Sequence, residues 1–185
     1  MTMAVIILLR IYKVLLWNQA NFDMLTGLPN RAMFHDRLAQ ELKKADRSDQ
    51  SFALMLVDLD RFKDVNDTHG HAMGDILLQE AARRMVDCVR ESDTVARLGG
   101  DEFIVVLPQL NDPKYAENIA KKIITALAAP FQLRDQVAHV SASLGIALYP
   151  QDAVDIGHLI RNADQAMYAA KNNGRNSFSY YHARP

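Results

Sequence analysis

The sequence contains one cysteine, no excess of charge of either sign and no glycine-rich, serine-rich or proline-rich linker. Cys88 alone cannot form a disulfide framework or a cysteine-rich zinc site, and its apolar neighbours favour a packed thiol. Lysine and arginine total 21 against 22 acidic residues, for a net charge of −1. This balance indicates no broad basic surface for nucleic acid. A Walker A motif is also absent, which excludes a P-loop nucleoside triphosphatase.

The sequence lacks a long apolar run as well. Its most apolar stretch, MAVIILLRIYKVLLW, is interrupted by Arg10 and Lys13 and is shorter than the roughly 20 residues of a membrane span. We therefore expect no membrane span within the chain. No small-residue cleavage site follows, which argues against a signal peptide, and the expected location is cytoplasmic.

Apolar residues do recur at helical spacing near the N-terminus, at Val5, Leu8, Leu9, Tyr12, Leu15 and Leu16. The spacing predicts a helix with an apolar stripe. The stripe could pair with a second copy of the chain, or the segment could be the cut end of a longer helix from an upstream module. The expected organisation is an N-terminal helix or linker over residues 1–20 and one domain over residues 21–182, a length sufficient for a proper core.

Periodicity predicts the elements of this domain. Helices are predicted over residues 28–45, 70–89, 115–127 and 155–174, strands over 51–60 and 138–150, and a hairpin over 93–107. Asn30 is the expected N-cap of the first helix, and Gly99–Gly100 are the expected hairpin turn. The strand over 138–150 alternates, which predicts one buried face. This order favours an α+β (mixed α/β) fold, with helices covering a central, mainly antiparallel sheet.

Two pairs of acids lie at the ends of predicted strands. Asp58 and Asp60 close one strand, and Asp101 and Glu102 follow the hairpin turn. If the strands are neighbours, the carboxylates share one edge of the sheet, where their repulsion is relieved by a bound cation. Carboxylate oxygens suit Mg²⁺, with substrate phosphates completing the shell. The alternative is that these are solvated acids at strand ends.

Groups that could bind phosphate occur nearby. Gly99 and Gly100 have no Cβ, so a ligand can approach their backbone closely. Lys63 and the backbone N–H groups at a helix start form a natural anion site. Lys171 and Arg175 end the last helix, where the alternative is that they favour the helix dipole and nothing more.

Asn66 and Asp75 are further polar candidates. A carboxylate and an amide can match the two adjacent donors and the acceptor of guanine, an edge that adenine does not present. Taken alone, these two residues are better interpreted as helix-cap or turn residues.

Five motifs occur in order between Asp23 and Phe178: DMLTGLPNR, DLDRFKDVNDTHGHAMGD, RLGGDEF, SLGIALYP and ADQAMYAAKNNGRN. Together they resemble the GGDEF domain family, the diguanylate cyclases, over nearly the whole chain. The resemblance implies a fold like the palm of nucleotide cyclases and polymerases. It also implies that the acids behind the glycine turn bind metal.

The resemblance implies a reaction between two subunits of a homodimer. Each subunit would bind one GTP, and each 3′-hydroxyl would attack the α-phosphate of the other GTP, giving cyclic di-GMP and pyrophosphate. Two Mg²⁺ or Mn²⁺ ions per active site would be held by Asp58, the carbonyl of Leu59, Asp101 and Glu102. Asp101 and Glu102 match the catalytic positions, and Asp101 is the candidate for helping to deprotonate the 3′-hydroxyl.

The resemblance also assigns substrate contacts. Asn66 and Asp75 match the guanine-reading positions. Phosphate contacts match Phe62, Lys63, Lys171 and Arg175, beside the backbone of Gly99 and Gly100.

A regulatory site is implied by RESD, in which Arg90 and Asp93 have the spacing of the family's RxxD inhibitory motif. Product bound there would hold the subunits apart, with Arg90 stacking on guanine or pairing with phosphate and Asp93 accepting from a guanine edge. The alternative is an ordinary surface arginine at a helix end.

The motifs also resemble those of GGDEF domains that are followed by an EAL phosphodiesterase module. We therefore expect a fragment of a longer protein. Two functions remain open: an active cyclase, or a GTP-binding domain that regulates an adjacent EAL module.

Overall fold

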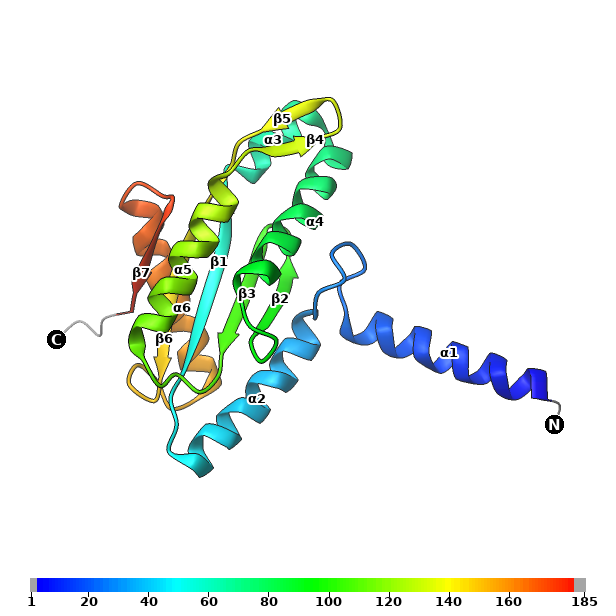
Figure 1. Ribbon diagram of the computed structural model, residues 1–185, viewed down its shortest axis with the longest axis horizontal. Helices are drawn as coiled ribbons and strands as arrows, with labels where there is room; N and C mark the ends of the chain where they lie inside the picture. The colour runs from blue at the N-terminus through cyan, green and yellow to red at the C-terminus, as the bar shows by residue number, and fades with distance from the viewer. Residues whose placement is uncertain (1–2, 182–185) are drawn as a thin grey trace.

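The computed structural model describes residues 3–181, which form an α+β domain with one projecting helix (Figure 1). The helices are α1 (Met3–Asn21), α2 (Arg31–Ser48), α3 (Phe62–His69), α4 (His71–Cys88), α5 (Pro113–Ala128) and α6 (Ile156–Asn172). The strands are β1 (Phe52–Asp60), β2 (Thr94–Gly99), β3 (Glu102–Leu107), β4 (Phe131–Leu133), β5 (Gln136–Ala138), β6 (Ser141–Tyr149) and β7 (Ser177–Tyr180).

The central sheet has the strand order β2-β3-β1-β6-β7, and β4 pairs with β5 in a separate hairpin. Strand β1 lies in the middle, antiparallel to both β3 and β6, while β6 and β7 are parallel. The sheet is therefore mainly antiparallel, which confirms the predicted fold class.

Helices cover both faces of this sheet, with α4 and α5 on one side and α2 and α6 on the other (Figure 1). Alternate residues of β1 divide between the two sides: Met55 and Val57 pack with α4 and α5, while Leu54 and Leu56 pack with α2 and α6. Because side chains alternate along a strand, Asp58 and Asp60 continue the α6 side to the end of β1.

Gly145 allows α6 to lie directly on β6. A Cβ built at this position would come within 1.9 Å of the carbonyl oxygen of Ala163 and 2.2 Å of the amide nitrogen of Met167. The glycine in the SLGIALYP motif is therefore a packing requirement. It brings the C-terminal end of α6 close to the end of β1.

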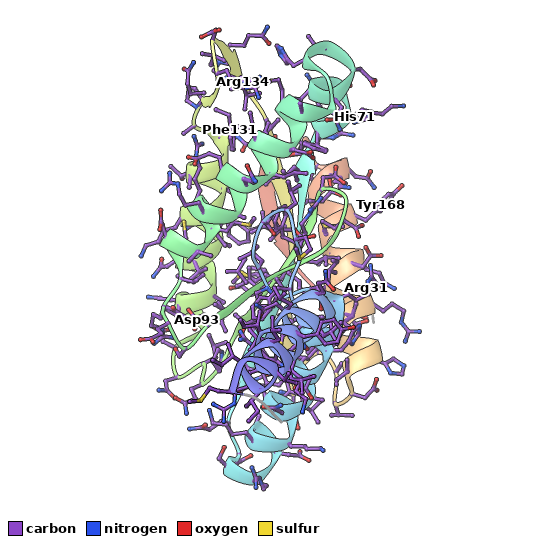
Figure 2. All side chains as sticks on the ribbon, turned by 90° about the vertical axis from the view of Figure 1, so that its right-hand side faces the viewer. Arg31, His71, Asp93, Phe131, Arg134 and Tyr168 are labelled. Atoms are coloured by element: carbon purple, nitrogen blue, oxygen red, sulfur yellow. The ribbon has the colours of Figure 1, made fainter. Side chains whose placement is uncertain are left out.

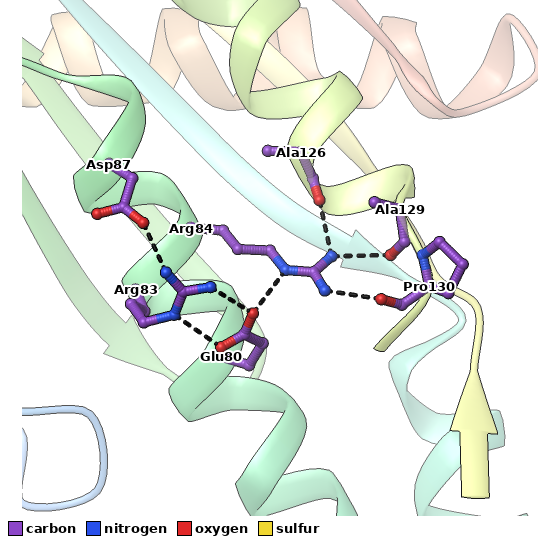
Figure 3. Close-up of polar contacts among 7 residues, drawn as sticks. All are labelled: Glu80, Arg83, Arg84, Asp87, Ala126, Ala129 and Pro130. Carbon is purple, nitrogen blue, oxygen red and sulfur yellow. Dashed lines mark hydrogen bonds and ion pairs between the residues drawn. The ribbon is translucent and has the colours of Figure 1, made fainter. Parts of the chain in front are cut away.

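Arg84 fastens α4 to the end of α5 (Figure 3). Its guanidinium donates hydrogen bonds of 2.7–2.8 Å to the carbonyls of Ala126, Ala129 and Pro130, and it lies 3.9 Å from the ring centre of Phe131. Glu80 accepts from Arg84 on the other side. Ala126 lies in the last turn of α5, whose carbonyls lack partners within the helix, and Ala129 and Pro130 follow the helix directly. Arg84 therefore caps the end of α5 from a neighbouring helix.

Helix α1 exposes apolar residues around its whole circumference, whereas the sequence predicted a single stripe. Residues off the predicted stripe are exposed as well, with Ile7 and Ile11 at 51% and Trp17 at 53%. Asn30, the confirmed N-cap of α2, also ties the end of α1, because its side-chain amide donates to the carbonyl of Ala20 at 2.9 Å. Across residues 3–181, no helix is both long enough and apolar enough to cross a membrane.

Two further predictions need correction, and three strands were missed. The hairpin turns at Gly100–Asp101, because Gly99 pairs with Glu102 and a bulge between Arg97 and Gly99 shifts the register by one residue. Strand β6 is buried on both faces, since helices lie on both sides of the sheet. The short strands β4, β5 and β7 were not predicted.

Candidate active site

Carboxylates from two neighbouring strands meet at the end of β1. Asp58 is the cross-strand partner of Glu102, and the amide of Leu59 donates to the carbonyl of Asp101 at 3.3 Å. A residue's N–H and C=O lie on the same side of an antiparallel strand, so the Leu59 carbonyl also faces the hairpin. The structure therefore brings together Asp58, Leu59, Asp101 and Glu102, the four positions named from the sequence.

Lys171 reaches this acidic edge from the last turn of α6. Its ammonium lies 2.9 Å from Oδ1 of Asp58, so it does more than complement the helix dipole. Burial raises the pKa of the Asp58 carboxyl, Lys171 opposes the shift, and the charges of Asp101 and Asp60 add to it. The edge thus holds more negative charge than one lysine neutralises, which is the condition that favours a bound cation.

Asp60 has a structural role that differs from that of Asp58. It is 3% exposed and accepts hydrogen bonds from Ser141 (2.6 Å), Ser143 (2.7 Å) and the amide of Asn176 (3.2 Å). Arg175 lies 3.9 Å away and is itself half exposed. Asp60 therefore fixes the loop after α6, which presents Arg175 at the edge of the site.

The turn of the hairpin depends on its two glycines. Gly99 and Gly100 have φ angles of 139° and 54°, which residues with a side chain rarely adopt. A Cβ at either position would meet no atom within 4 Å. The glycines therefore serve the backbone conformation, and they leave the backbone of the turn open to a ligand.

Asp23 and Arg97 clamp this turn, an interaction that the sequence analysis missed. The Arg97 guanidinium donates to the carbonyl of Gly100 at 2.7 and 3.0 Å and to both oxygens of Asp23 at 3.0 and 3.2 Å. Thr26 donates to Asp23 as well. The pKa of Asp23 is lowered, because these hydrogen bonds outweigh the opposing effect of its burial. Asp23 is the first residue of the DMLTGLPNR motif, but its partner Arg97 lies 74 residues further along the chain.

The start of α3 follows directly from the acidic edge. Arg61 is in the left-handed conformation with φ 60° and provides no side-chain cap, so the first N–H groups of α3 have no side-chain partner there. Phe62 is buried and anchors the turn, while Lys63 is exposed beside it. Uncapped N–H groups and a nearby lysine suit a phosphate group.

Asn66 lies over the first turn of α4, and Gly74 makes room for it. A Cβ at Gly74 would come within 1.9 Å of Oδ1 of Asn66 and 3.2 Å of the ring of Phe62. Asn66 is half-buried and Asp75 is exposed. Gly74 is thus a supporting residue that the sequence analysis did not single out, although it lies within the HAMGD segment.

The residues of the edge fit a divalent ion whose shell is completed by substrate. Within residues 3–181, no group of three or more His, Cys, Asp or Glu side chains is arranged to hold a metal ion by itself. Mg²⁺ commonly binds through one or two carboxylates together with substrate phosphates. Asp58, the Leu59 carbonyl and the acids of the hairpin supply oxygen donors of that kind.

Arg90 and Asp93 form a separate cluster in the loop between α4 and β2. Figure 2 shows Asp93 on the opposite side of the molecule from Tyr168, which lines a groove along α6 with Glu102 and Lys171. The Asp93 side chain is fully buried and accepts from the amide of Arg90 at 2.9 Å and from the hydroxyl of Tyr115 at 2.7 Å. This loop therefore lies apart from the acidic edge.

The fold and this edge define the class of protein: an α+β domain with a carboxylate site at the end of a mainly antiparallel sheet. The chain belongs to the GGDEF family, since residues 20–177 match the family described as "Diguanylate cyclase, GGDEF domain".

Relatives support this assignment. The bifunctional diguanylate cyclase/cyclic di-GMP phosphodiesterase MucR of Pseudomonas aeruginosa is 46% identical over 159 residues, 86% of this chain and 23% of MucR. The diguanylate cyclase TpbB of the same species is 46% identical over 161 residues, 86% of this chain and 37% of TpbB. The chain thus spans less than half of either relative.

Solved structures give the same result. The GGDEF domain of TpbB superposes with a TM-score of 0.85 at 44% identity, covering 87% of this chain and 94% of that one. The coiled coil and GGDEF domain of DgcB from Caulobacter crescentus, in complex with c-di-GMP, gives a TM-score of 0.86 at 26% identity, covering 96% and 94%.

Proposed function

We propose that this domain is a diguanylate cyclase that condenses two GTP molecules into cyclic di-GMP and pyrophosphate. The observation that carries the proposal is the meeting of Asp58, Asp101 and Glu102 at one end of the sheet, beside the uncapped start of α3. A carboxylate edge next to an anion site is what the transfer of a nucleotidyl group requires.

Each group has a role in this proposal. The start of α3 and Lys63 bind the triphosphate, with Lys171 and Arg175 approaching from the end of α6. Asn66 and Asp75 read the guanine edge, and Gly74 keeps the space that Asn66 occupies. Phe62 is buried beneath this corner and fixes its geometry.

Negative charge at the reacting phosphate is neutralised at the acidic edge. Asp58, the Leu59 carbonyl, Asp101 and Glu102 would hold two Mg²⁺ or Mn²⁺ ions, which when bound neutralise the phosphates and the attacking and leaving oxygens. Asp101 lies in the turn itself and accepts the proton of the 3′-hydroxyl. An ion held by Asp58 would replace its ion pair with Lys171, and the Lys171 ammonium would then be available to a phosphate.

The reaction requires two subunits, because one subunit holds one GTP. Two domains face each other with the two triphosphates between them, and each hydroxyl attacks across the interface. Positioning supplies most of the rate enhancement in a reaction of this type.

A second function is supported by MucR, a relative whose name includes a phosphodiesterase activity. In that setting the domain would bind GTP and regulate an adjacent EAL module. The cyclase is favoured because the acids, the glycine turn and its Asp23–Arg97 clamp are all in place.

The test is incubation of the purified chain at high concentration with GTP and Mg²⁺ or Mn²⁺, followed by chromatography for cyclic di-GMP. We expect slow product formation with GTP and none with ATP, since adenine lacks paired donors for Asp75. Asp101→Ala and Glu102→Ala should remove activity while leaving the fold intact. GTP binding without product in the wild-type chain would instead support the regulatory function.

A further inference from the structure

A single residue, Gly70, separates α3 from α4, and this junction brings α3 against the first turn of α4. Gly70 has a φ angle of 84°, in a region that glycine adopts readily. Its amide donates to the carbonyl of Asn66 at 2.8 Å, and its carbonyl accepts from the amide of Gly74 at 3.2 Å. Asn66 and Gly74 therefore lie at matching distances before and after the turn, where the two helices meet.

The side chain of Asn66 lies directly on the backbone of Gly74. A Cβ built at Gly74 would come within 1.9 Å of Oδ1 of Asn66, 3.0 Å of its Cγ and 3.2 Å of Cζ of Phe62. All three atoms belong to side chains, and Asn66 is half-buried, so its amide can turn toward solvent. A methyl group at residue 74 would therefore displace the Asn66 amide and leave the backbone of both helices in place.

No backbone requirement explains the glycine at this position. Gly74 lies inside α4 with a negative φ, and alanine is more favourable than glycine in a helix by about 1 kcal/mol. Gly145 is the opposite case, because a Cβ there would meet backbone atoms of α6. What the glycine at residue 74 provides is room for the Asn66 amide.

The same space places the Asn66 amide next to the position that carries Asp75. Asp75 follows Gly74 directly and is exposed. An ionised carboxylate only accepts hydrogen bonds, whereas an amide both donates and accepts. Hydrogen bonds select one base over another only where the groups are held in register with the base edge, since a mismatched pair leaves polar groups unsatisfied.

We propose that Gly74 is a positioning residue for base selection: by leaving space for the Asn66 amide beside Asp75, it sets the preference for guanine over adenine. This inference rests on the proposed reading of guanine by Asn66 and Asp75. It adds a residue to which neither the sequence pattern nor the resemblance to the family assigns a role.

The experiment is calorimetry on the full chain with 3′-deoxy-GTP and 3′-deoxy-ATP in the presence of Mg²⁺. Neither ligand carries the attacking hydroxyl, so no product forms during the titration. Gly74→Ala should bind 3′-deoxy-GTP about tenfold more weakly than wild type, as expected for the loss of one hydrogen bond. Its affinity for 3′-deoxy-ATP should stay within about twofold of wild type, because adenine does not use the displaced amide.

The matched control is Gly157→Ala, a second glycine-to-alanine change within a helix. A Cβ at Gly157 would meet only Oδ1 of Asp155, at 3.4 Å. This variant should bind both ligands as wild type does. A tenfold loss of 3′-deoxy-GTP affinity in the control would overturn the inference, because the effect would then not depend on Asn66.

A double variant separates positioning from a general effect on the site. In the Asn66→Ala background no amide remains to be displaced, so adding Gly74→Ala should change the affinity for 3′-deoxy-GTP by less than about twofold. Gly74→Ala alone should have the same thermal unfolding midpoint as wild type or a higher one. A further loss of affinity in the double variant, or a clearly lower midpoint, would show that Gly74 acts through the fold and would overturn the inference.

The remaining outcomes distinguish this inference from the proposed function. Unchanged affinity of Gly74→Ala for 3′-deoxy-GTP, or an equal loss for 3′-deoxy-ATP, would refute a role in base selection. A wild-type chain that binds 3′-deoxy-GTP but converts no GTP would remove the cyclase and leave the result for Gly74 standing. Absence of 3′-deoxy-GTP binding in the wild type would overturn both the guanine site and the role given to Gly74.

Discussion

Asp58 illustrates how a candidate site residue opposes stability. Its pKa is raised above 3.8, chiefly by burial, so the folded domain favours the protonated carboxyl more than the unfolded chain does. The ionised form therefore destabilises the metal-free domain. This effect appears as the pH rises through 3.8 and is complete above the raised pKa.

Asp58→Asn should consequently leave the metal-free domain as stable as wild type or more stable at neutral pH. Thermal unfolding would show an equal or higher midpoint, and the difference should vanish below the ordinary pKa. Turnover should fall on the order of a hundredfold or more, because a neutral amide would hold the divalent ion of the proposed reaction less well than a carboxylate does. A clearly lower midpoint for Asp58→Asn would contradict the destabilising role of this carboxylate.

Arg83 and Arg84 are adjacent residues with different expected contributions to stability. Arg84 is largely buried and caps three carbonyls, while the Arg83 side chain is 62% exposed and pairs with Glu80 and Asp87 on its own helix (Figure 3). Arg84→Lys should lower the free energy of unfolding by about 1–3 kcal/mol, as expected for hydrogen bonds from a charged donor. Arg83→Lys should leave it almost unchanged, because ion pairs between exposed side chains contribute little to stability. Urea unfolding measures both, and similar losses in the two variants would show that Arg84 is not the cap of α5.

The contact between Asp23 and Arg97 that clamps the hairpin could not be predicted from the sequence. The acids of the site were found because they end two strands whose apolar runs are unmistakable. Asp23 and Arg97 lie 74 residues apart, and nothing in local spacing pairs them. Their contact exists only once the segment before α2 has packed along β2, where the amide of Arg97 donates to the carbonyl of Pro29.

At the scale of elements, α2, α4, α5 and α6 were predictable because each repeats apolar residues over several turns. The strands β4, β5 and β7 have three or four residues each, too few to show a period. Strand β7 is stabilised by its parallel pairing with β6. Two consecutive parallel strands need a crossover connection, and α6 is that connection here. Such a strand is defined by its neighbour and not by its own composition.

The contact between α6 and β6 gives a test at this scale. Gly145→Ala would force a Cβ against the backbone of α6, and it should lower the free energy of unfolding by about 1–3 kcal/mol or more. Gly157→Ala is the matched control, because its Cβ would meet only Asp155 Oδ1 at 3.4 Å. The control should be neutral or stabilising by up to about 1 kcal/mol, from helix propensity. Equal stability of Gly145→Ala and wild type in urea would show that the helix can move away from the sheet.

At the scale of the whole molecule, α1 projects from a domain that is complete without it (Figure 1). No residue of α1 belongs to either core cluster of the described chain, and its apolar side chains are exposed on all sides. A second copy of the helix would bury part of that surface. Pairing of α1 would also bring two domains within reach of each other, as the proposed reaction requires.

Deleting residues 1–18 should therefore lower activity at a fixed enzyme concentration while preserving the fold. In both chains, specific activity should rise with enzyme concentration in the dilute range, and the truncated chain should need a higher concentration to reach the same value. Activity assays over a dilution series, with sedimentation analysis, measure this. Specific activity independent of dilution in a strictly monomeric protein would refute a two-subunit reaction.

Asp60 affects how the results of any genetic screen should be interpreted. It lies two residues from Asp58, yet it joins Ser141, Ser143 and Asn176 below the surface. Loss-of-function alleles would therefore arise at both positions with the same phenotype. Cellular abundance would separate them: alleles at Asp60 would deplete the protein, whereas alleles at Asp58 would leave it plentiful and inactive.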